Sequence, residues 1–301
     1  MLQLALLFCC LIAGIVLRQL KPTPPDAALW LNRALVWFFI PALTLLHLPE
    51  TSLDRRFVWP IAVPWLVFGV GWIFFLGVTR FNRWPRQTLG ALVLTGGISS
   101  VSFVGFPIFE MLYGPTGLAM GILMSQAGTF LVVSTVGVSM AAWYGADHPS
   151  VRGMLRGVLT FPPFIALALA LVLNASDYTH TPTIRAVLQG LSTPFSVVAL
   201  LSVGLQLGGP SLFLHRRALQ WGLAYKLLLA PLLVWFVCYY LDAPAGTVTG
   251  VCVLGSSLGP MNTAAIVVSR YRLNVSLASQ MVAIGIPLSL PLVFLLYWLL
   301  P

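Results

Sequence analysis

Long apolar segments joined by short polar connections make up almost the whole chain. Each segment is about 20 residues long, the length that an α-helix needs to cross roughly 30 Å of hydrocarbon. No polar stretch is long enough to fold separately, so residues 1–301 form a single membrane transporter domain in this interpretation. The pattern predicts an all-α integral membrane protein with ten transmembrane helices at residues 3–20, 31–49, 58–79, 93–114, 117–142, 154–174, 184–208, 217–240, 246–269 and 274–299.

Two of the apolar segments are interrupted by Gly, Ser and Pro. The first interruption reads TGGISSVSFVGFPIFE and the second reads GVCVLGSSLGPMNTAA. Pro107 of the first and Pro260 of the second are 153 residues apart (260 − 107), and the same offset separates Gly97 from Gly250. A helix that breaks inside lipid leaves backbone groups unpaired at a cost of several kcal/mol each. The interruptions therefore predict a protein-lined site at membrane depth.

The offset also predicts that the chain is built from two repeats. We assign the first five-helix repeat to residues 1–146 and the second to residues 147–301. Five is an odd number, so the second repeat crosses the membrane with the opposite polarity and the repeats are inverted. Inverted repeats that each contain a discontinuous helix are typical of secondary transporters, whose substrate site lies near the bilayer midplane.

Composition and charge agree with a membrane protein. Charged residues make up 8% of the chain, against about 25% in soluble domains. The net charge of +9 would suit a nucleic-acid-binding protein, but the arginines lie singly or in pairs in the connections or at segment ends, so we expect no nucleic-acid partner. Twelve of the 16 follow the odd-numbered segments and three follow the even-numbered ones. The positive-inside rule then places both termini on the outer side of the membrane.

Nothing in the sequence points to catalysis or to a cofactor. The four cysteines lie in apolar segments and the four histidines have no ligand spacing, so we predict neither a disulfide framework nor a metal site. No Ser/His/Asp or His-x-x-Glu set occurs within the segments, as an intramembrane enzyme would require. We therefore predict no catalytic residues, no cofactor and no enzymatic activity.

The polar groups around the two interruptions are the predicted binding site. Pro suits the first turn of a helix, so Pro107 and Pro260 are predicted to begin the second halves of the broken helices, whose N-termini favour a carboxylate. Serine in a membrane helix commonly donates to its own helix, so the Asn262 amide, both donor and acceptor, is the strongest group. The predicted substrate-binding residues are Ser99, Ser100, Ser102, Gly105, Pro107, Ser256, Ser257, Pro260, Asn262, Thr263 and Lys226.

Lys226 lies deep inside a predicted helix, and Glu110 is the only carboxylate within the predicted helices. Lys226 lies about ten residues beyond Arg217, or roughly 15 Å along a helix, which places it near mid-membrane. A charge there is by default functional, with an anionic substrate or Glu110 as its counter-charge; a static contact to backbone carbonyls is the alternative. Glu110 carries a coupling proton if it is buried, and is inert if it lies solvated at the outer surface.

The first interruption also resembles a known transporter motif. The sequence SVSFVGFP is close to the pattern NxGFxGxP: Phe103, Gly105 and Pro107 match, whereas Ser100 and Ser102 replace its Asn and Gly. Further similar pieces are FIPALTLL, STPFSVVALLSVGLQLG, YKLLLAPLL and GPMNTAAIVVSRYRLN. In this order they resemble a bacterial member of the auxin efflux carrier family, which belongs with the bile acid/sodium symporters in one superfamily.

The resemblance implies a scaffold domain and a transport domain, with the two broken helices crossing in an X. Together with the distribution of Lys and Arg it implies a bacterial inner membrane location with periplasmic termini, and it suggests a homodimer. We predict an exporter or exchanger of small organic anions, such as carboxylates or auxin-like acids, that works by alternating access at the crossover of the fourth and ninth helices.

Two other functions remain open on the same fold. One is a sodium-coupled symporter of bile-acid-like amphipathic anions. The fourth and ninth segments lack the dense carboxylate and amide set of a paired sodium site, which disfavours it. The other is a sensor or assembly partner without transport, which differs from a carrier only in flux.

Overall fold

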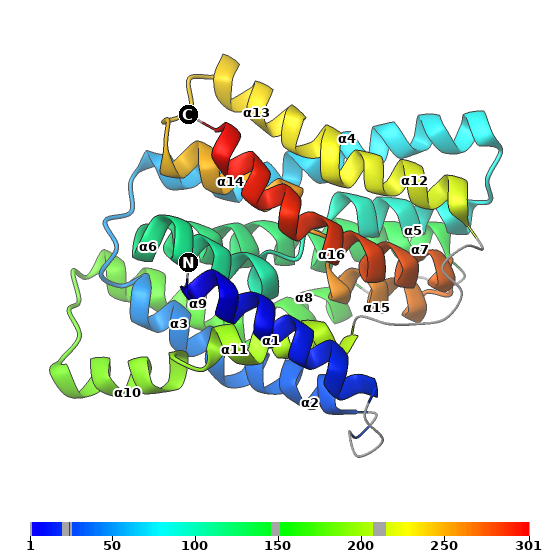
Figure 1. Ribbon diagram of the computed structural model, residues 1–301. Coiled ribbons are helices and arrows are strands. Elements are labelled where there is room, and N and C mark those ends of the chain that lie inside the picture. The colour runs from blue at the N-terminus through cyan, green and yellow to red at the C-terminus, as the bar shows by residue number, and fades with distance from the viewer. Residues whose placement is uncertain (1, 20–23, 25, 146–150, 207–214, 301) are drawn as a thin grey trace. The chain divides into compact units, whose positions relative to one another are not determined.

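The computed structural model describes residues 2–19, 24, 26–145, 151–206 and 215–300 (Figure 1). Within these ranges the chain is mostly helical, without a β-strand, as the apolar pattern predicts. In the described residues, 6 helices are long and apolar enough to cross a membrane: Ala27–His47, Arg55–Asn82, Val101–Tyr144, Pro182–Gln206, Arg216–Tyr240 and Val275–Leu299. Ten helices in inverted repeats remain a prediction, and the predicted repeat boundary at residues 146 and 147 lies outside the described residues.

The chain folds into two compact units. Unit 1 comprises Met1–Asp54, Ser102–Ile122 and Val158–Gly208. Unit 2 comprises Arg55–Val101, Leu123–Gly157 and Gly209–Pro301. Each unit therefore draws on both halves of the sequence, and the chain passes between the units several times.

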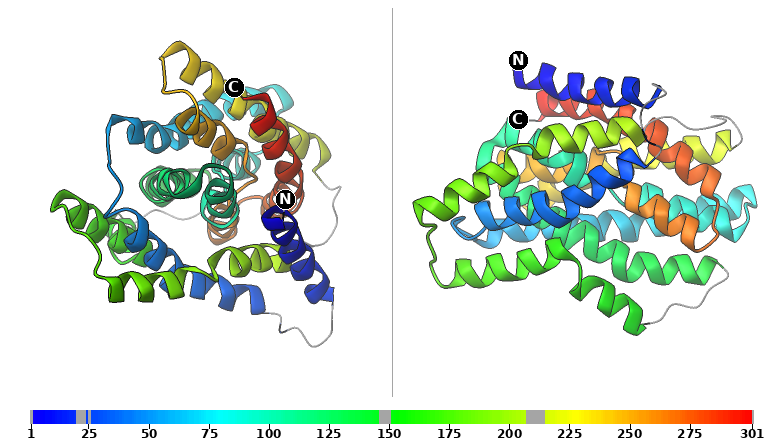
Figure 2. Two further views of the ribbon diagram at one scale, coloured as in Figure 1. Left: turned by 60° about the vertical axis from the view of Figure 1, so that its left-hand side comes forward. Right: turned by 90° about the horizontal axis from the view of Figure 1, so that it is seen from below.

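Unit 1 is a set of apolar helices packed in pairs. The dark-blue α1 and the blue α2 both pack against the yellow-green α11, and α3 packs against α9 and α10 (Figure 1, Figure 2). The helices of this unit are α1 (Leu2–Gln19), α2 (Ala27–Ala34), α3 (Ile40–His47), α6 (Phe106–Leu123, to Ile122 in this unit), α9 (Pro162–Ala175), α10 (Pro182–Ser192) and α11 (Phe195–Gln206). Within α6 the backbone kinks at Gly114, which has a φ of 63° and precedes Pro115.

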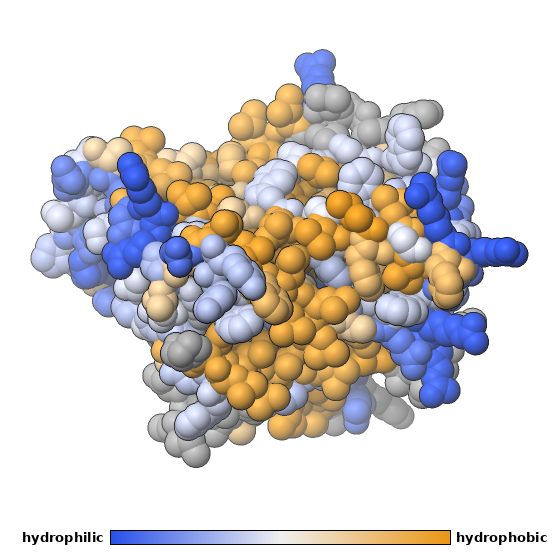
Figure 3. Space-filling model, turned by 90° about the horizontal axis from the view of Figure 1, so that it is seen from above, coloured by the Kyte–Doolittle hydropathy of each residue, from blue (hydrophilic) through white to orange (hydrophobic). Residues whose placement is uncertain are grey.

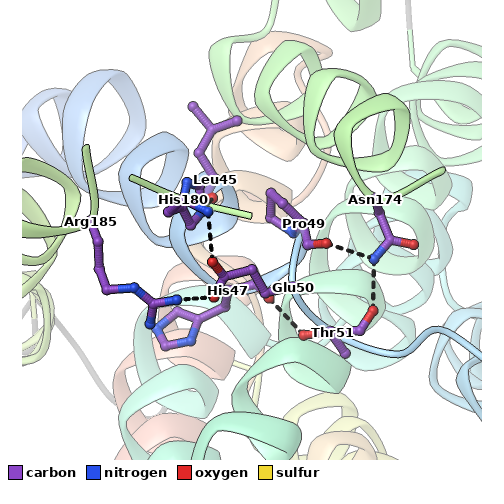
Figure 4. A network of polar contacts seen from close by, with 8 residues as sticks. All are labelled: Leu45, His47, Pro49, Glu50, Thr51, Asn174, His180 and Arg185. Carbon is purple, nitrogen blue, oxygen red and sulfur yellow. Dashed lines mark hydrogen bonds and ion pairs between the residues drawn. The ribbon is translucent and has the colours of Figure 1, made fainter. Parts of the chain in front are cut away.

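A polar network holds the segment after α3 against α9 and α10 (Figure 4). The Asn174 side chain, near the end of α9, donates from Nδ2 to the carbonyl oxygens of Leu48, Pro49 and Thr51 at 3.0, 3.0 and 2.7 Å. The two N–H groups of one amide are thereby shared among three carbonyls of the segment that follows α3.

Glu50 is the charged centre of the same network. Its Oε1 accepts a hydrogen bond from the backbone N–H of His180 at 2.8 Å, and its Oε2 pairs with the Arg185 guanidinium. The His180 ring donates from Nε2 to the Leu45 carbonyl at 2.9 Å. The backbone N–H of His180, followed by Arg185, lowers the pKa of Glu50 below its ordinary value.

This lowered pKa predicts a loss of stability in acid. Because the folded-state pKa of Glu50 is below the unfolded value of about 4.3, the network contributes fully above that value and its contribution disappears as the pH falls through the folded pKa. Glu50→Gln is expected to lower the free energy of unfolding at neutral pH by about 1 kcal/mol or less, because the Arg185 side chain is 47% exposed. The thermal midpoint should fall accordingly. Below about pH 4, the stability of wild type should decline partly because Glu50 takes up a proton. The variant should lack this part of the decline.

Thermal unfolding of the detergent-purified protein between neutral pH and the acid limit measures both effects. Asp26→Asn is the matched control, because Asp26 precedes α2 without a side-chain capping bond. An acid decline of the same size in Glu50→Gln and wild type would show that the network does not contribute to the pH dependence.

Unit 2 is built around two long helices, α4 and α16. α4 packs against α5, α13 and α14, and the red α16 packs against α5, α12, α14 and α15 (Figure 1). The face drawn in Figure 3 is apolar through its middle, with hydrophilic side chains gathered at the edges of the view. The helices of this unit are α4 (Val58–Asn82), α5 (Arg86–Gly97), α7 (Val138–Tyr144), α8 (Val151–Leu159, to Gly157 in this unit), α12 (Arg216–Ala224), α13 (Ala230–Tyr240), α14 (Thr247–Ser257), α15 (Asn262–Arg270) and α16 (Val275–Leu299).

Several spans of unit 2 contain π-helical turns. These turns cover Met124–Phe130, Val133–Gly137 and Tyr225–Leu229, and the last one joins α12 to α13. A π-helical turn widens the helix locally and is frequent at functional sites. The π-helical turn at Tyr225–Leu229 contains Lys226.

Candidate functional site

Two helices of unit 2 stop within the apolar interior. α5 ends at Gly97 and α14 ends at Ser257. The next residue is non-helical in both, with φ and ψ of −122° and 125° at Ile98 and −58° and 146° at Leu258. Helical structure starts again at Val101 and at Asn262. The two predicted interruptions are thus real helix breaks.

The two breaks pair with each other through their backbones. Ser99 and Pro260 form an antiparallel bridge. The N–H of Ser100 donates to the Gly259 carbonyl at 2.8 Å, and the N–H of Met261 donates to the Ile98 carbonyl at 3.1 Å. Backbone groups that a broken helix would leave unpaired in hydrocarbon are satisfied in this way. We call residues 98–100 and 258–261 the crossover.

The role predicted for the two prolines is partly wrong. Helical structure resumes six residues before Pro107 (107 − 101), so Pro107 does not begin the second half-helix, whereas Pro260 lies two residues before α15 (262 − 260). Gly250, the predicted counterpart of Gly97, lies inside α14, and the two helix ends are 160 residues apart (257 − 97) instead of 153. The breaks lie where the two segments pair: Pro260 lies within the second break, whereas Pro107 does not mark the first.

Lys226 lies at the crossover. Its side chain is fully buried, with 0% of its surface exposed, and its Nζ donates a hydrogen bond to Ser99 Oγ. The structure therefore joins two predicted site residues from distant parts of the sequence. The contact is to a hydroxyl group and not to the backbone carbonyls of the alternative interpretation. Glu110, the predicted counter-charge, belongs to α6 of unit 1, where its residue is exposed.

A cavity of unit 2 opens beside the first break. Its empty volume is about 230 Å³, and in this conformation it is wide enough for about one water molecule. Ser99, Ser256 and Thr129 are its polar lining residues, and the remaining wall is mostly apolar. The full lining consists of Val63, Pro64, Val67, Gly97, Ile98, Ser99, Met124, Thr129, Val132 and Ser256.

The other predicted residues of unit 2 differ in how well their polar groups are satisfied. Ser256 and Ser257 donate to the carbonyls of Val253 and Leu254 in their own helix, at 2.7 and 2.8 Å. Asn262 begins α15 and its Nδ2 is buried without a hydrogen-bond partner in the part of the chain that the structure describes. Asn262 therefore remains the strongest of the neutral candidates. Ser100 is buried and Thr263 is half-buried.

Four predicted residues belong to unit 1. Gly105 and Pro107 are buried, Ser102 is half-buried and Glu110 is exposed. Glu110 lies within the candidate span Val101–Tyr144, and its role as a proton carrier or as a solvated, inert group stays a prediction. The structure brings together Ser99, Ser100, Ser256, Pro260 and Lys226 through the bridge, the hydrogen bonds and the cavity of unit 2.

Sequence reasoning missed how closely α4 and α16 pack against their neighbours around the crossover. An added Cβ at Gly128 would lie 2.7 Å from Pro64 Cγ, and one at Gly285 would lie 2.5 Å from Pro260 Cδ. The Tyr225 hydroxyl donates to the Val67 carbonyl at 2.5 Å, beside the cavity. Pro64 carries a usable signal, since a proline inside an apolar span marks a perturbed helix. The glycines carry none, because their close contacts depend on the fold.

Comparison with known proteins gives consistent matches over the chain. The profile of the family described as "Membrane transport protein" matches residues 1–297. An uncharacterized transporter of Methanocaldococcus jannaschii is 21% identical over 280 residues, which cover 90% of this chain and 89% of the relative. An uncharacterized transporter of Methanothermobacter thermautotrophicus is 27% identical over 289 residues, which cover 92% of this chain and 90% of the relative.

Proposed function

Because this chain belongs to the membrane transport protein family, that of the auxin efflux carriers, and is a multi-pass secondary transporter, we propose that it exports or exchanges small organic anions, such as carboxylates or auxin-like acids. The substrate binds at the crossover of unit 2. One observation carries the proposal: a fully buried lysine meets the paired helix breaks beside a cavity. A charge at such a place is a functional hypothesis by default.

The remaining parts of the proposal follow from the sequence pattern. Ten helices in two inverted repeats give the crossover one broken helix from each repeat, the arrangement of carriers that work by alternating access. Unit 2, which holds the crossover, acts as the transport domain, and unit 1 acts as the scaffold. The excess of Lys and Arg in alternate connections orients the protein in a bacterial inner membrane with periplasmic termini. A homodimer is part of the proposal on resemblance alone.

A thermal-shift screen of the detergent-purified protein tests this function. The screen covers mono- and dicarboxylates, indole acids and bile acids, each with and without sodium. A ligand present at a hundred times its dissociation constant adds about 2.7 kcal/mol of apparent stability. Stabilisation without sodium, followed by uptake of the same anion into proteoliposomes, is the expected result. Stabilisation that requires sodium would indicate the symporter, and binding without any uptake would indicate a sensor.

Asn262→Ala is expected to weaken binding of the stabilising anion by about tenfold, the value of one lost hydrogen bond in a buried site. The thermal midpoint without ligand should stay near that of wild type, because Asn262 Nδ2 has no protein partner among the described residues. Thr193→Ala is a control in unit 1, where the hydroxyl donates within α10. Wild-type affinity of the Asn262→Ala protein would remove Asn262 from the site.

A further inference from the structure

The contact between Lys226 and Ser99 leaves one hydroxyl proton without an acceptor. A lysine ammonium can only donate, so Ser99 Oγ is the acceptor of this hydrogen bond. The Ser99 O–H proton must then point elsewhere, and the described residues offer it no acceptor. Ser99 is only 7% exposed and lines the cavity. The hydroxyl is therefore a buried donor at the cavity wall that no described residue accepts from.

The charge of Lys226 is also uncompensated within its unit. In the described part of unit 2, Asp242 is the sole carboxylate, and it follows the end of α13. It lies 16 residues from Lys226 (242 − 226), more than about 20 Å along a helix. A buried ammonium without a counter-charge costs several kcal/mol. The hydroxyl of Ser99 offsets part of this cost with a dipole, but it supplies no charge.

We propose that Lys226 and Ser99 form a subsite for one negative charge, so that the carrier selects monocarboxylates over dicarboxylates of similar size. This inference rests on the proposed function and names the class of its substrate. A carboxylate oxygen accepts from the Ser99 hydroxyl, whose own oxygen accepts from Lys226. The single charge of the anion balances the single charge of the ammonium through this chain of two hydrogen bonds.

A second carboxylate finds no cationic partner among the residues that line the cavity. The nearest basic residues along the same helix are Arg216 and Arg217, about 15 Å from Lys226 and exposed. The rest of the cavity wall is provided largely by Val63, Val67 and Val132, which accept apolar groups. Burying a second charge against this wall costs far more than burying a methylene group. The apolar wall therefore selects the uncharged end of the substrate.

Matched ligands test the charge directly on the whole purified protein. The smaller set is propionate, propionamide and malonate, and the larger set is benzoate, benzamide and phthalate. At neutral pH each set contains a monoanion, its neutral isostere and a dianion. The thermal midpoint of wild type should rise with the monoanion of at least one set. The amide and the dianion should need about tenfold higher concentration or more for the same shift.

Variants assign this selectivity to the two residues. Lys226→Met keeps the length and apolar volume of the side chain, and should reduce the preference for the monoanion over its amide by about tenfold or more. Lys226→Arg should retain a preference for anions, and Ser99→Ala should weaken it. Arg217→Met, which removes an exposed charge from the same helix, is the matched control and should behave as wild type.

The outcomes separate this inference from the function on which it rests. If wild type binds a dianion as tightly as its monoanion, or if Lys226→Met keeps the full preference, the subsite is wrong while the anion carrier stands. If wild type binds no anion in this panel or in the broader screen, both proposals fall. The comparison of ligands on wild type needs no variant, so a misfolded Lys226→Met leaves the proposal falsifiable.

Discussion

Gly259→Ala is expected to destabilise unit 2 by about 3 kcal/mol and to abolish transport. This value is the upper end of the typical range for substitutions that overpack a core. An added Cβ at Gly259 would lie 2.6 Å from Ile286 Cα and 2.7 Å from Ile286 N. These are backbone atoms of the middle of α16, so no side-chain rotation relieves the clash. The crossover must move instead, which breaks the 2.8 Å hydrogen bond from Ser100 N–H to the Gly259 carbonyl.

The thermal midpoint in detergent and uptake into proteoliposomes measure the two effects of this substitution. Gly69→Ala in α4 of the same unit is the control, because an added Cβ there meets no atom within 4 Å. Alanine in place of glycine in a helix interior should leave stability unchanged or raise it by up to about 1 kcal/mol. A Gly259→Ala protein with the stability and transport of wild type would show that the backbone of α16 is not in close contact with the crossover.

Gly14→Val or Gly204→Val is expected to destabilise unit 1 by a similar amount, about 3 kcal/mol. The backbones of α1 and α11 touch at these glycines: an added Cβ at Gly14 would lie 2.4 Å from the Leu201 carbonyl oxygen, and one at Gly204 would lie 2.3 Å from that of Leu11. Small residues allow such close approach, which drives helix association in membranes through van der Waals contact. A valine on either side separates the pair.

Thermal unfolding combined with limited proteolysis detects this separation, since a detached α1 becomes accessible to protease at its ends. Gly190→Ala in α10 of unit 1 is the control, as its added Cβ would meet no atom within 4 Å. Because either valine alone already separates the helices, the double variant should be less destabilised than the sum of the single variants. Single variants as stable as wild type would contradict the close packing of α1 on α11.

The membrane fold and much of the candidate site follow from local sequence properties. Apolar length predicts spanning helices because hydrocarbon thickness fixes the number of residues needed. The clusters of Gly and Ser around Ser99 and Ser256 predicted helix breaks, and the structure contains both. Lys226 was recognisable because a charge far from either end of an apolar span is costly and therefore needs a reason.

The sequence by itself determined the class of protein, the two segments that contain interruptions and the presence of a lysine far inside an apolar span. Tertiary structure alone decided that the breaks lie at residues 98–100 and 258–261 and not at Pro107, because the pairing of two distant segments fixes them. It also decided that Lys226 meets Ser99 while Glu110 belongs to the other unit. The physical reason is the same in each case: a local pattern reports the cost of burying a group, and only the packed fold shows which partner offsets that cost.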